Sequence, residues 1–245
     1  MKCKPIFSMM AALVFMAACN SGMAQRPAAS INFPKGEQNS LTAQEKADGW
    51  KLLFNGENLE GWHVEEKYKG NWSVERGVII SDQNGPSHLY TDGKYKNFEA
   101  TWDVCAYDVR IPKQRMGNSG VFVRTVKRDA GFPLGYEIQV DAYDPGHPTG
   151  GIYNAGFKGD VRGTLLVDKD GNWKPEAFLE VHEGKWFNQR VKVEGNRIQI
   201  WINGKQTLDW TDPESKFPEA GPLALQNHHG TDVVLFTNIK IKEMD

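Results

Sequence analysis

The sequence contains few cysteines, and this limits how the fold can be stabilised. Cys3, Cys19 and Cys105 are the three cysteines among 245 residues. The first two lie in or beside an expected export segment, so Cys105 would be the one thiol of the folded domain. An intramolecular disulfide is therefore excluded. The remaining chain of about 200 residues is long enough to form a single hydrophobic core instead.

The sequence also lacks any block of basic residues. Without Lys2 and Lys4, the 29 basic residues fall to 27 against 31 acidic ones, a formal charge of −4. We therefore expect no nucleic-acid partner. Phosphoryl transfer, structural zinc and serine hydrolysis have no support either, because there is no glycine-rich phosphate loop, Cys-x-x-Cys pair, His-Glu-x-x-His motif or nucleophile elbow.

Residues 1–24 have the pattern of an export signal. Lys2 and Lys4 precede an apolar run over residues 6–18 that is too short to span a bilayer. Met16-Ala17-Ala18-Cys19 resembles a bacterial lipobox, whose cysteine is lipidated, and cleavage after Ala24 is the alternative. Both alternatives predict an exported protein, periplasmic or an outer-membrane lipoprotein, that meets the membrane only through a lipid on Cys19.

The chain after the signal is expected to contain a linker and one domain. Residues 25–40 are rich in proline, glycine and small polar residues, which predicts a flexible linker. A single domain is expected over residues 41–245. Thr42-Ala43-Gln44-Glu45 fits a capping box and predicts one short helix at its start.

Short strand patterns then recur between turn residues, with no amphipathic helix among them. In residues 197–202 three isoleucines alternate with Arg197, Gln199 and Trp201, and Asn203-Gly204 favours a tight hairpin. Many short strands with tight turns predict an all-β fold, an antiparallel sandwich or jelly roll. The expected strands cover residues 72–81, 98–107, 120–126, 136–143, 190–193, 197–202 and 233–241.

The strand over residues 135–141 carries the most informative polar pattern. Glu137, Gln139 and Asp141 share one face, while Ile138 and Val140 share the other. Two carboxylates and an amide in one row are costly unless they meet water, a ligand or a metal ion.

Two other segments also place polar side chains at alternate positions of a strand. Arg124 shares a face with Phe122, and Gln226 shares one with His228, whereas His229 is expected to point away. If these strands are neighbours, one groove is lined by Arg124, Glu137, Gln139, Asp141, Gln226 and His228. The alternative is an ordinary solvated sheet face. A tryptophan exposed beside the groove would stack on a sugar ring.

Several ordered motifs resemble those of the 3-keto-disaccharide hydrolase domain family, over about residues 41–242. The family is implied to have a concanavalin- and laminarinase-like jelly roll of two antiparallel sheets, and to act on glycosides whose sugar is oxidised to a ketone at carbon 3. The motifs lie in residues 45–62, 72–75, 118–124, 135–141, 149–153, 201–204, 225–226 and 238–240.

The chemistry of such a substrate suggests roles for the residues that match these motifs. Glu137 is expected to be the general base, with Asp141 or His228 as its catalytic partner. Substrate binding is expected from Arg124, Gln139, Gln226 and Asn118. The enolate formed at the ketone would be stabilised by Arg124 or by a divalent metal ion on Glu137, Asp141 or His228.

Two other functions remain open from the sequence. A non-catalytic carbohydrate-binding module has the same kind of sandwich. A conventional glycosidase would use Glu137 and Asp141, but four residues along a strand separate their α-carbons by about 13 Å. That distance exceeds the carboxyl separation of retaining and inverting enzymes unless the side chains converge.

Overall fold

The protein is a sandwich of two antiparallel β-sheets, seen in a computed structural model that describes residues 31–65, 72–82, 86–108, 117–128, 132–141, 149–153, 181–182 and 184–245. The predicted export segment, with Cys19, lies outside these residues. The all-β jelly-roll prediction is confirmed. No helix in the described ranges is long and apolar enough to cross a membrane.

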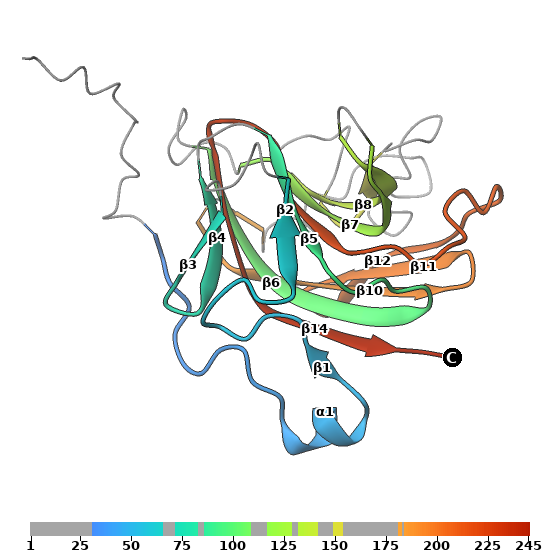
Figure 1. Ribbon diagram of the computed structural model, residues 1–245, viewed down its shortest axis with the longest axis horizontal. Coiled ribbons are helices and arrows are strands. Elements are labelled where there is room, and N and C mark those ends of the chain that lie inside the picture. The colour runs from blue at the N-terminus through green and yellow to red at the C-terminus, as the bar shows by residue number, and fades with distance from the viewer. Residues whose placement is uncertain are drawn as a thin grey trace, which may run out of the picture.

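The larger sheet has eight strands, and its long strands β6 and β14 run across the middle of the molecule (Figure 1). Its order is β12 (Lys205–Thr211), β11 (Arg197–Ile202), β10 (Phe187–Glu194), β6 (Phe98–Asp108), β14 (Asp232–Glu243), β4 (Val78–Asp82) and β3 (Trp72–Glu75), with β1 (Lys51–Leu52) beside β14. The expected strand over residues 72–81 is therefore two strands, because Arg76 and Gly77 form a turn with positive φ angles.

The smaller sheet has six strands. Their order is β2 (Trp62–Val64), β5 (Ser87–Thr91), β13 (Ala224–Asn227), β7 (Ser119–Val126), β8 (Leu134–Val140) and β9 (Ile152–Tyr153).

The core fills the space between the two sheets. Phe98, Trp102 and Val104 project from β6, and they belong to the same buried cluster as Val121 of β7 and Ile138 of β8. Alternate side chains of the smaller sheet therefore point away from the core, onto its outer face.

Two local predictions are confirmed. Helix α1 (Ala43–Ala47) begins with the expected capping box, in which Thr42 and Glu45 bind each other's backbone amides. The Asn203-Gly204 turn joins β11 to β12 with φ angles of 47° and 78°, the positive values that such a hairpin requires.

The described end of the expected linker, residues 31–40, lies against the larger sheet. Ile31 and Phe33 pack on a second apolar cluster that includes the buried Cys105. Asn39 exchanges hydrogen bonds with Asn238 of β14, at 2.7 and 2.9 Å. The folded structure therefore extends to the N-terminal side of Leu41.

A β-bulge interrupts β7 near its end. The register with β8 shifts between Val123 and Val126, and Arg124 has a positive φ of 50°. A bulge changes the direction in which the following side chains point. Arg124 and Thr125 therefore do not continue the alternation that holds from Ser119 to Val123.

Candidate functional site

The strand registers place one side chain from each strand of the smaller sheet in a single row on its outer face. His63 pairs with Tyr90, Tyr90 with Ala224, and Ala224 with Phe122. Phe122 then pairs with Glu137, which pairs with Tyr153. A parallel second row contains His88 beside Gln226 and Gly120 beside Gln139.

The polar side chains of these rows are buried although they face away from the core. Glu137 and Gln139 are each 3 % exposed, Gln226 is 1 % exposed and His88 is 7 % exposed. This burial contradicts the alternative of an ordinary solvated sheet face, on which such side chains would meet water.

Part of this face is hollowed into a groove of about 170 Å³. The groove brings together four of the residues predicted from the sequence, Glu137, Gln139, Asn118 and His228. Tyr153, which was not predicted, is the fifth lining residue. Gln226 lies in the second row, beside His88 and near this groove. Asp141 was also predicted to line the groove, but it is not among the lining residues. It follows β8, is 1 % exposed, and donates its backbone amide to Thr149 Oγ1 at 2.9 Å.

Arg124 does not share this groove, so the expectation that it lines the groove is corrected. Its guanidinium donates to Lys96 O at 2.8 Å, to Phe217 O at 3.1 Å and to Asn97 Oδ1 at 3.2 Å. Burial lowers the pKa of this guanidinium, with nearby Tyr136 opposing the shift. The physical reason for the correction is the bulge, which turns Arg124 away from the face that Phe122 occupies.

The groove and its surroundings contain buried polar atoms without partners among the described residues. They are Gln139 Oε1, Asn118 Oδ1, Gln226 Oε1 and His88 Nε2. A buried polar atom without a hydrogen bond costs free energy, and most such atoms in proteins are paired. Four of them on one sheet face indicate a site for a ligand rich in hydrogen-bonding groups.

Aromatic side chains surround the same atoms. Phe132 stacks on His228 with ring centroids 5.5 Å apart, and His88 meets the edges of Phe132 and Phe122 at 5.4 Å. Burial, and then the charge of His228, lowers the pKa of His88 to about 3, so that this imidazole is neutral at ordinary pH.

Exposed apolar surface is concentrated at this sheet. The three exposed large hydrophobic side chains of the described ranges are Val126, Phe132 and Tyr153, which lie in or beside its strands. No tryptophan of the described residues lines the groove, and Trp62, Trp72 and Trp102 are buried. The exposed aromatic rings at this sheet are those of Tyr153 and Phe132. Sequence patterns did not predict His88, Tyr90, Phe132 and Tyr153 as site residues. The alternation of His88 and Tyr90 in β5 was the signal that could have identified two of them.

Two residues of the turn between β13 and β14, with the first residue of β14, could hold a metal ion. The ligand atoms of His228, His229 and Asp232 all lie within 4.8 Å of one another. His228 Nδ1 is 2.7 Å from His229 Nδ1, which is 3.4 Å from the buried Asp232 Oδ2. The expectation that His229 points away was wrong, because β13 ends at Asn227 and strand alternation stops there.

Residues 49–242, which contain every groove residue, match the sequence profile of the 3-keto-alpha-glucoside-1,2-lyase-like domain. The chain belongs to this family. The family match begins two residues after helix α1 and ends in β14, so it covers both sheets of the sandwich.

One curated protein and two solved structures are similar to this 3-keto-alpha-glucoside-1,2-lyase-like chain. A 3-keto-disaccharide hydrolase of Bacteroides thetaiotaomicron is 24 % identical over 255 aligned residues, covering 85 % of this chain and 83 % of that protein. A crystal structure of a candidate glycosyl hydrolase from Parabacteroides distasonis is 24 % identical with a TM-score of 0.60, covering 85 % of this chain and all of the other. A carbohydrate-binding module of Bacillus subtilis is 18 % identical with a TM-score of 0.51, covering 75 % and 96 %. The two solved structures show that the fold is shared.

Proposed function

We propose that the chain cleaves glycosides whose sugar carries a ketone at carbon 3, by proton abstraction, elimination and hydration. The observation that supports this most strongly is a buried carboxylate, Glu137, in a groove with the unpartnered amide oxygens of Gln139 and Asn118. Family membership and the name of the Bacteroides relative support the keto-sugar class.

The first step is removal of the proton on carbon 2 by Glu137. A neighbouring ketone acidifies this proton, since the electron pair of the broken C–H bond moves toward the oxygen on carbon 3. The carboxylate becomes a carboxylic acid, and an enolate forms. Hydrogen-bond donors near that oxygen stabilise the developing charge.

The amides of Gln139 and Asn118 are suited to this task. Each can present either an oxygen or an NH₂ group to the groove, because a half-turn of the amide exchanges the two. Arg124, which was expected to supply positive charge, donates instead to Lys96, Asn97 and Phe217. In our proposal, neutral donors therefore take over its role.

In the second step the enolate re-forms the ketone, a double bond forms between carbons 1 and 2, and the bond from carbon 1 to the aglycone oxygen breaks. His228, which lines the groove with Glu137, protonates the leaving oxygen. Asp141 is the second candidate. Water then adds to carbon 1, carbon 2 regains a proton, and the sum of the steps is hydrolysis.

The donor set of His228, His229 and Asp232 fits a divalent cation. Two imidazole nitrogens and one carboxylate are ligands that zinc and related ions accept. Such an ion would supply positive charge at the edge of the groove. With His228 as a ligand of the ion, Asp141 would be the residue that protonates the leaving oxygen. Of the metal candidates predicted from the sequence, His228 belongs to this set, and Glu137 and Asp141 do not.

The test is Glu137→Gln, assayed for sugar release from a 3-keto-disaccharide and from the same disaccharide before oxidation. We expect the wild-type protein to cleave only the oxidised sugar, and the variant to lose at least about 100-fold in turnover. Cleavage of both sugars would indicate a conventional glycosidase. Binding without cleavage would indicate a carbohydrate-binding module. Near-normal turnover by the variant would exclude Glu137 as the base.

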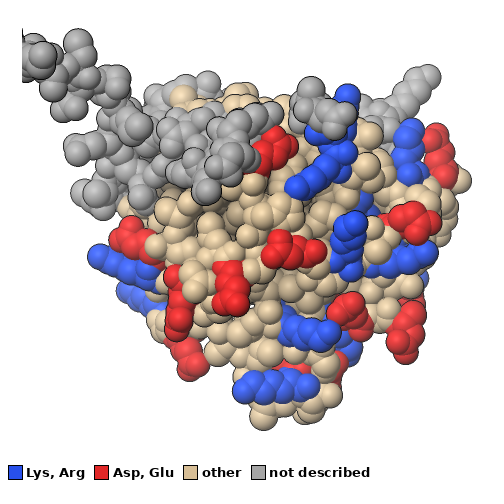
Figure 2. All heavy atoms as spheres, in the orientation of Figure 1, with Lys and Arg blue, Asp and Glu red and all other residues tan. Residues whose placement is uncertain are grey.

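On the face drawn in Figure 2, the basic and acidic side chains of the described residues are interspersed. This mixed charge is compatible with a neutral or weakly charged glycan.

A further inference from the structure

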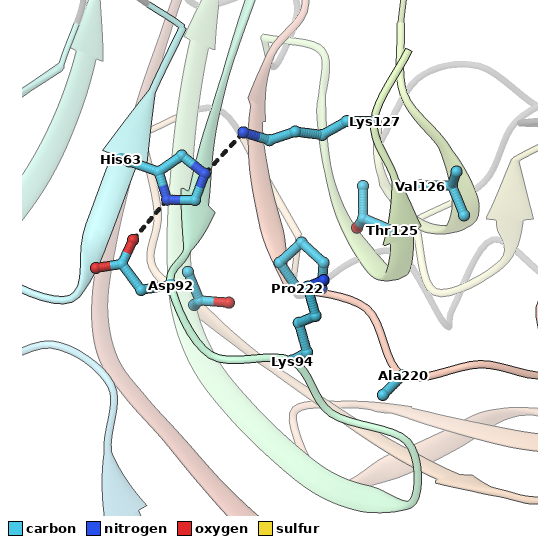
Figure 3. Close-up of a pocket in the computed structure, with 9 residues that line it drawn as sticks. His63, Asp92, Lys94, Thr125, Val126, Lys127, Ala220 and Pro222 are labelled. Atoms are coloured by element: carbon cyan, nitrogen blue, oxygen red, sulfur yellow. Dashed lines mark hydrogen bonds and ion pairs between the residues drawn. The ribbon is translucent and has the colours of Figure 1, made fainter.

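A second, larger cavity of about 380 Å³ lies on the smaller sheet, at the opposite end of β7 from the groove. Thr125 lines this cavity, whereas Gly120 lies beside Glu137 in the groove region. Five residues along a strand correspond to about 16 Å. Figure 3 shows side chains from β2, from the ends of β5 and β7, and from the segment before β13 around the cavity.

Lys127 extends over the cavity from the end of β7 to His63 of β2 (Figure 3). Its Nζ atom lies 2.7 Å from His63 Nε2, and His63 Nδ1 lies 2.6 Å from Asp92 Oδ1. An ammonium group can only donate, so Nε2 accepts and the imidazole proton lies on Nδ1, where it donates to Asp92. Asp92 and His63 therefore hold the Lys127 ammonium group in place.

The Lys127 ammonium group has hydrogens left for a ligand. Of its three N–H bonds, one is directed at His63, and the charge lies 4.3 Å from the centroid of the Tyr90 ring. Lys94 contributes a second ammonium group to the cavity lining, against the single carboxylate of Asp92. The charge of the lining is therefore positive.

Thr125 gives an independent indication of a ligand. Its side chain lines the cavity and is 4 % exposed, yet its Oγ1 atom has no hydrogen-bond partner among the described residues. The bulge at Arg124 sets this position. A buried hydroxyl without a partner is costly, and an acceptor bound in the cavity would satisfy it.

A continuous series of ring contacts connects the cavity to the groove. His228 at the groove stacks on Phe132, Phe132 meets His88, and His88 lies 6.1 Å from Tyr90. Tyr90 in turn stacks on His63 at 5.7 Å and lies beneath Lys127. Aromatic faces of this kind are suited to the apolar faces of sugar rings.

From these observations we propose that the cavity is a second subsite of the same face, which binds an anionic group, a carboxylate or a sulfate, carried by the glycan. The Lys127 ammonium group and the Thr125 hydroxyl bind the anion, and the sugar units next to it lie along the ring contacts toward the groove. The link to catalysis rests on the proposed function. The binding of the anion does not.

The experiment is a calorimetric titration of the full mature chain with glucuronate, with glucose and with inorganic sulfate. We expect glucuronate to bind at least tenfold more tightly than glucose, and its affinity to fall as salt is raised. Lys127→Met should weaken glucuronate binding at least tenfold. Asp92→Asn keeps a side-chain oxygen that can accept the hydrogen bond of His63, and it removes a negative charge that repels the anion, so it should strengthen binding. Thr125→Val should weaken it by a smaller factor. Lys51→Met, an exposed lysine on β1 of the other sheet, is the matched control and should leave affinity unchanged.

Equal affinity for glucuronate and glucose, or full affinity in a folded Lys127→Met variant, would overturn the proposal. Sulfate that competes with glucuronate would support a general anion subsite. If sulfate binds and glucuronate does not, the ligand of the subsite would be a sulfated glycan. The Glu137→Gln variant should bind glucuronate as the wild type does, so a failure of the catalytic proposal would be visible separately from a failure of this one.

Discussion

The carboxylate of Glu137 lies directly against Gly120 of the neighbouring strand. A β-carbon built on Gly120 would be 2.5 Å from Glu137 Oε1 and 2.7 Å from Glu137 Cγ, closer than any real contact. Glycine at this position therefore decides where the proposed base is held.

Gly120→Ala should therefore displace the Glu137 carboxylate while the fold is retained. The methyl group would push the Glu137 carboxylate aside, and a displacement of about 1 Å can cost roughly 100-fold in rate. We expect turnover of a 3-keto-disaccharide to fall by about that factor, with a melting temperature close to that of the wild type. Combining it with Glu137→Gln should add no further loss, since both changes act on one group. Full additivity of the two losses would show that Gly120 acts elsewhere.

Arg124 should prove to be a structural residue. Its three hydrogen bonds to Lys96, Phe217 and Asn97 involve a buried charged group, and each such bond contributes about 1.5 to 3 kcal/mol. Arg124→Met should lower the free energy of unfolding by about 3 kcal/mol or more in urea denaturation, while turnover of the folded protein stays within about threefold. Arg197→Met is a suitable control, because its ion pair with Asp209 is exposed and screened by solvent, so its loss should change stability little. A large loss of turnover in an Arg124→Met variant of unchanged stability would show that Arg124 acts in catalysis.

His88 should make the fold sensitive to acid. Its pKa is lowered from 6.5 to about 3, so between these values the unfolded chain takes up a proton that the folded chain does not. Stability is therefore full above pH 6.5 and falls as the pH falls through this window, by about 1.4 kcal/mol per pH unit. His88→Phe should remove this component, giving a shallower decline between pH 6 and 4 in unfolding measurements with a chelator present. Parallel stability curves for the two proteins would contradict the assignment.

A divalent ion should bind at the turn between β13 and β14. Cobalt(II) added to chelator-treated protein should give visible absorption that saturates near one equivalent. His229→Gln changes a half-exposed ligand and should weaken this binding at least tenfold, with the fold retained. Unchanged cobalt binding in this variant would show that the three side chains form only a hydrogen-bonded turn.

Much of the fold followed from local patterns in the sequence. The capping box at Thr42, the Asn203-Gly204 turn and the alternation in β8 each depend on neighbouring residues, and each is found in the structure. The groove position of Glu137 and Gln139 followed for the same reason, because β8 is a regular strand from Leu134 to Val140.

Strand alternation failed where the backbone departs from a regular strand. Arg124 is turned away by a bulge that depends on pairing with β8, and His229 follows the end of β13. Tyr153 and His63 were missed for another reason: their places in the row depend on registers between segments far apart in the chain. Such registers arise from packing of the whole sandwich and leave no mark in a short stretch of sequence.

The row from His63 to Tyr153 collects one side chain from each of six strands, whose positions in the chain span residues 62 to 227. A glycan bound along this row would contact all six strands, from β2 at one edge of the sheet to β9 at the other. Its binding energy would then oppose separation of every strand pair at once, and amide hydrogens throughout the smaller sheet would exchange more slowly, not only those next to the ligand.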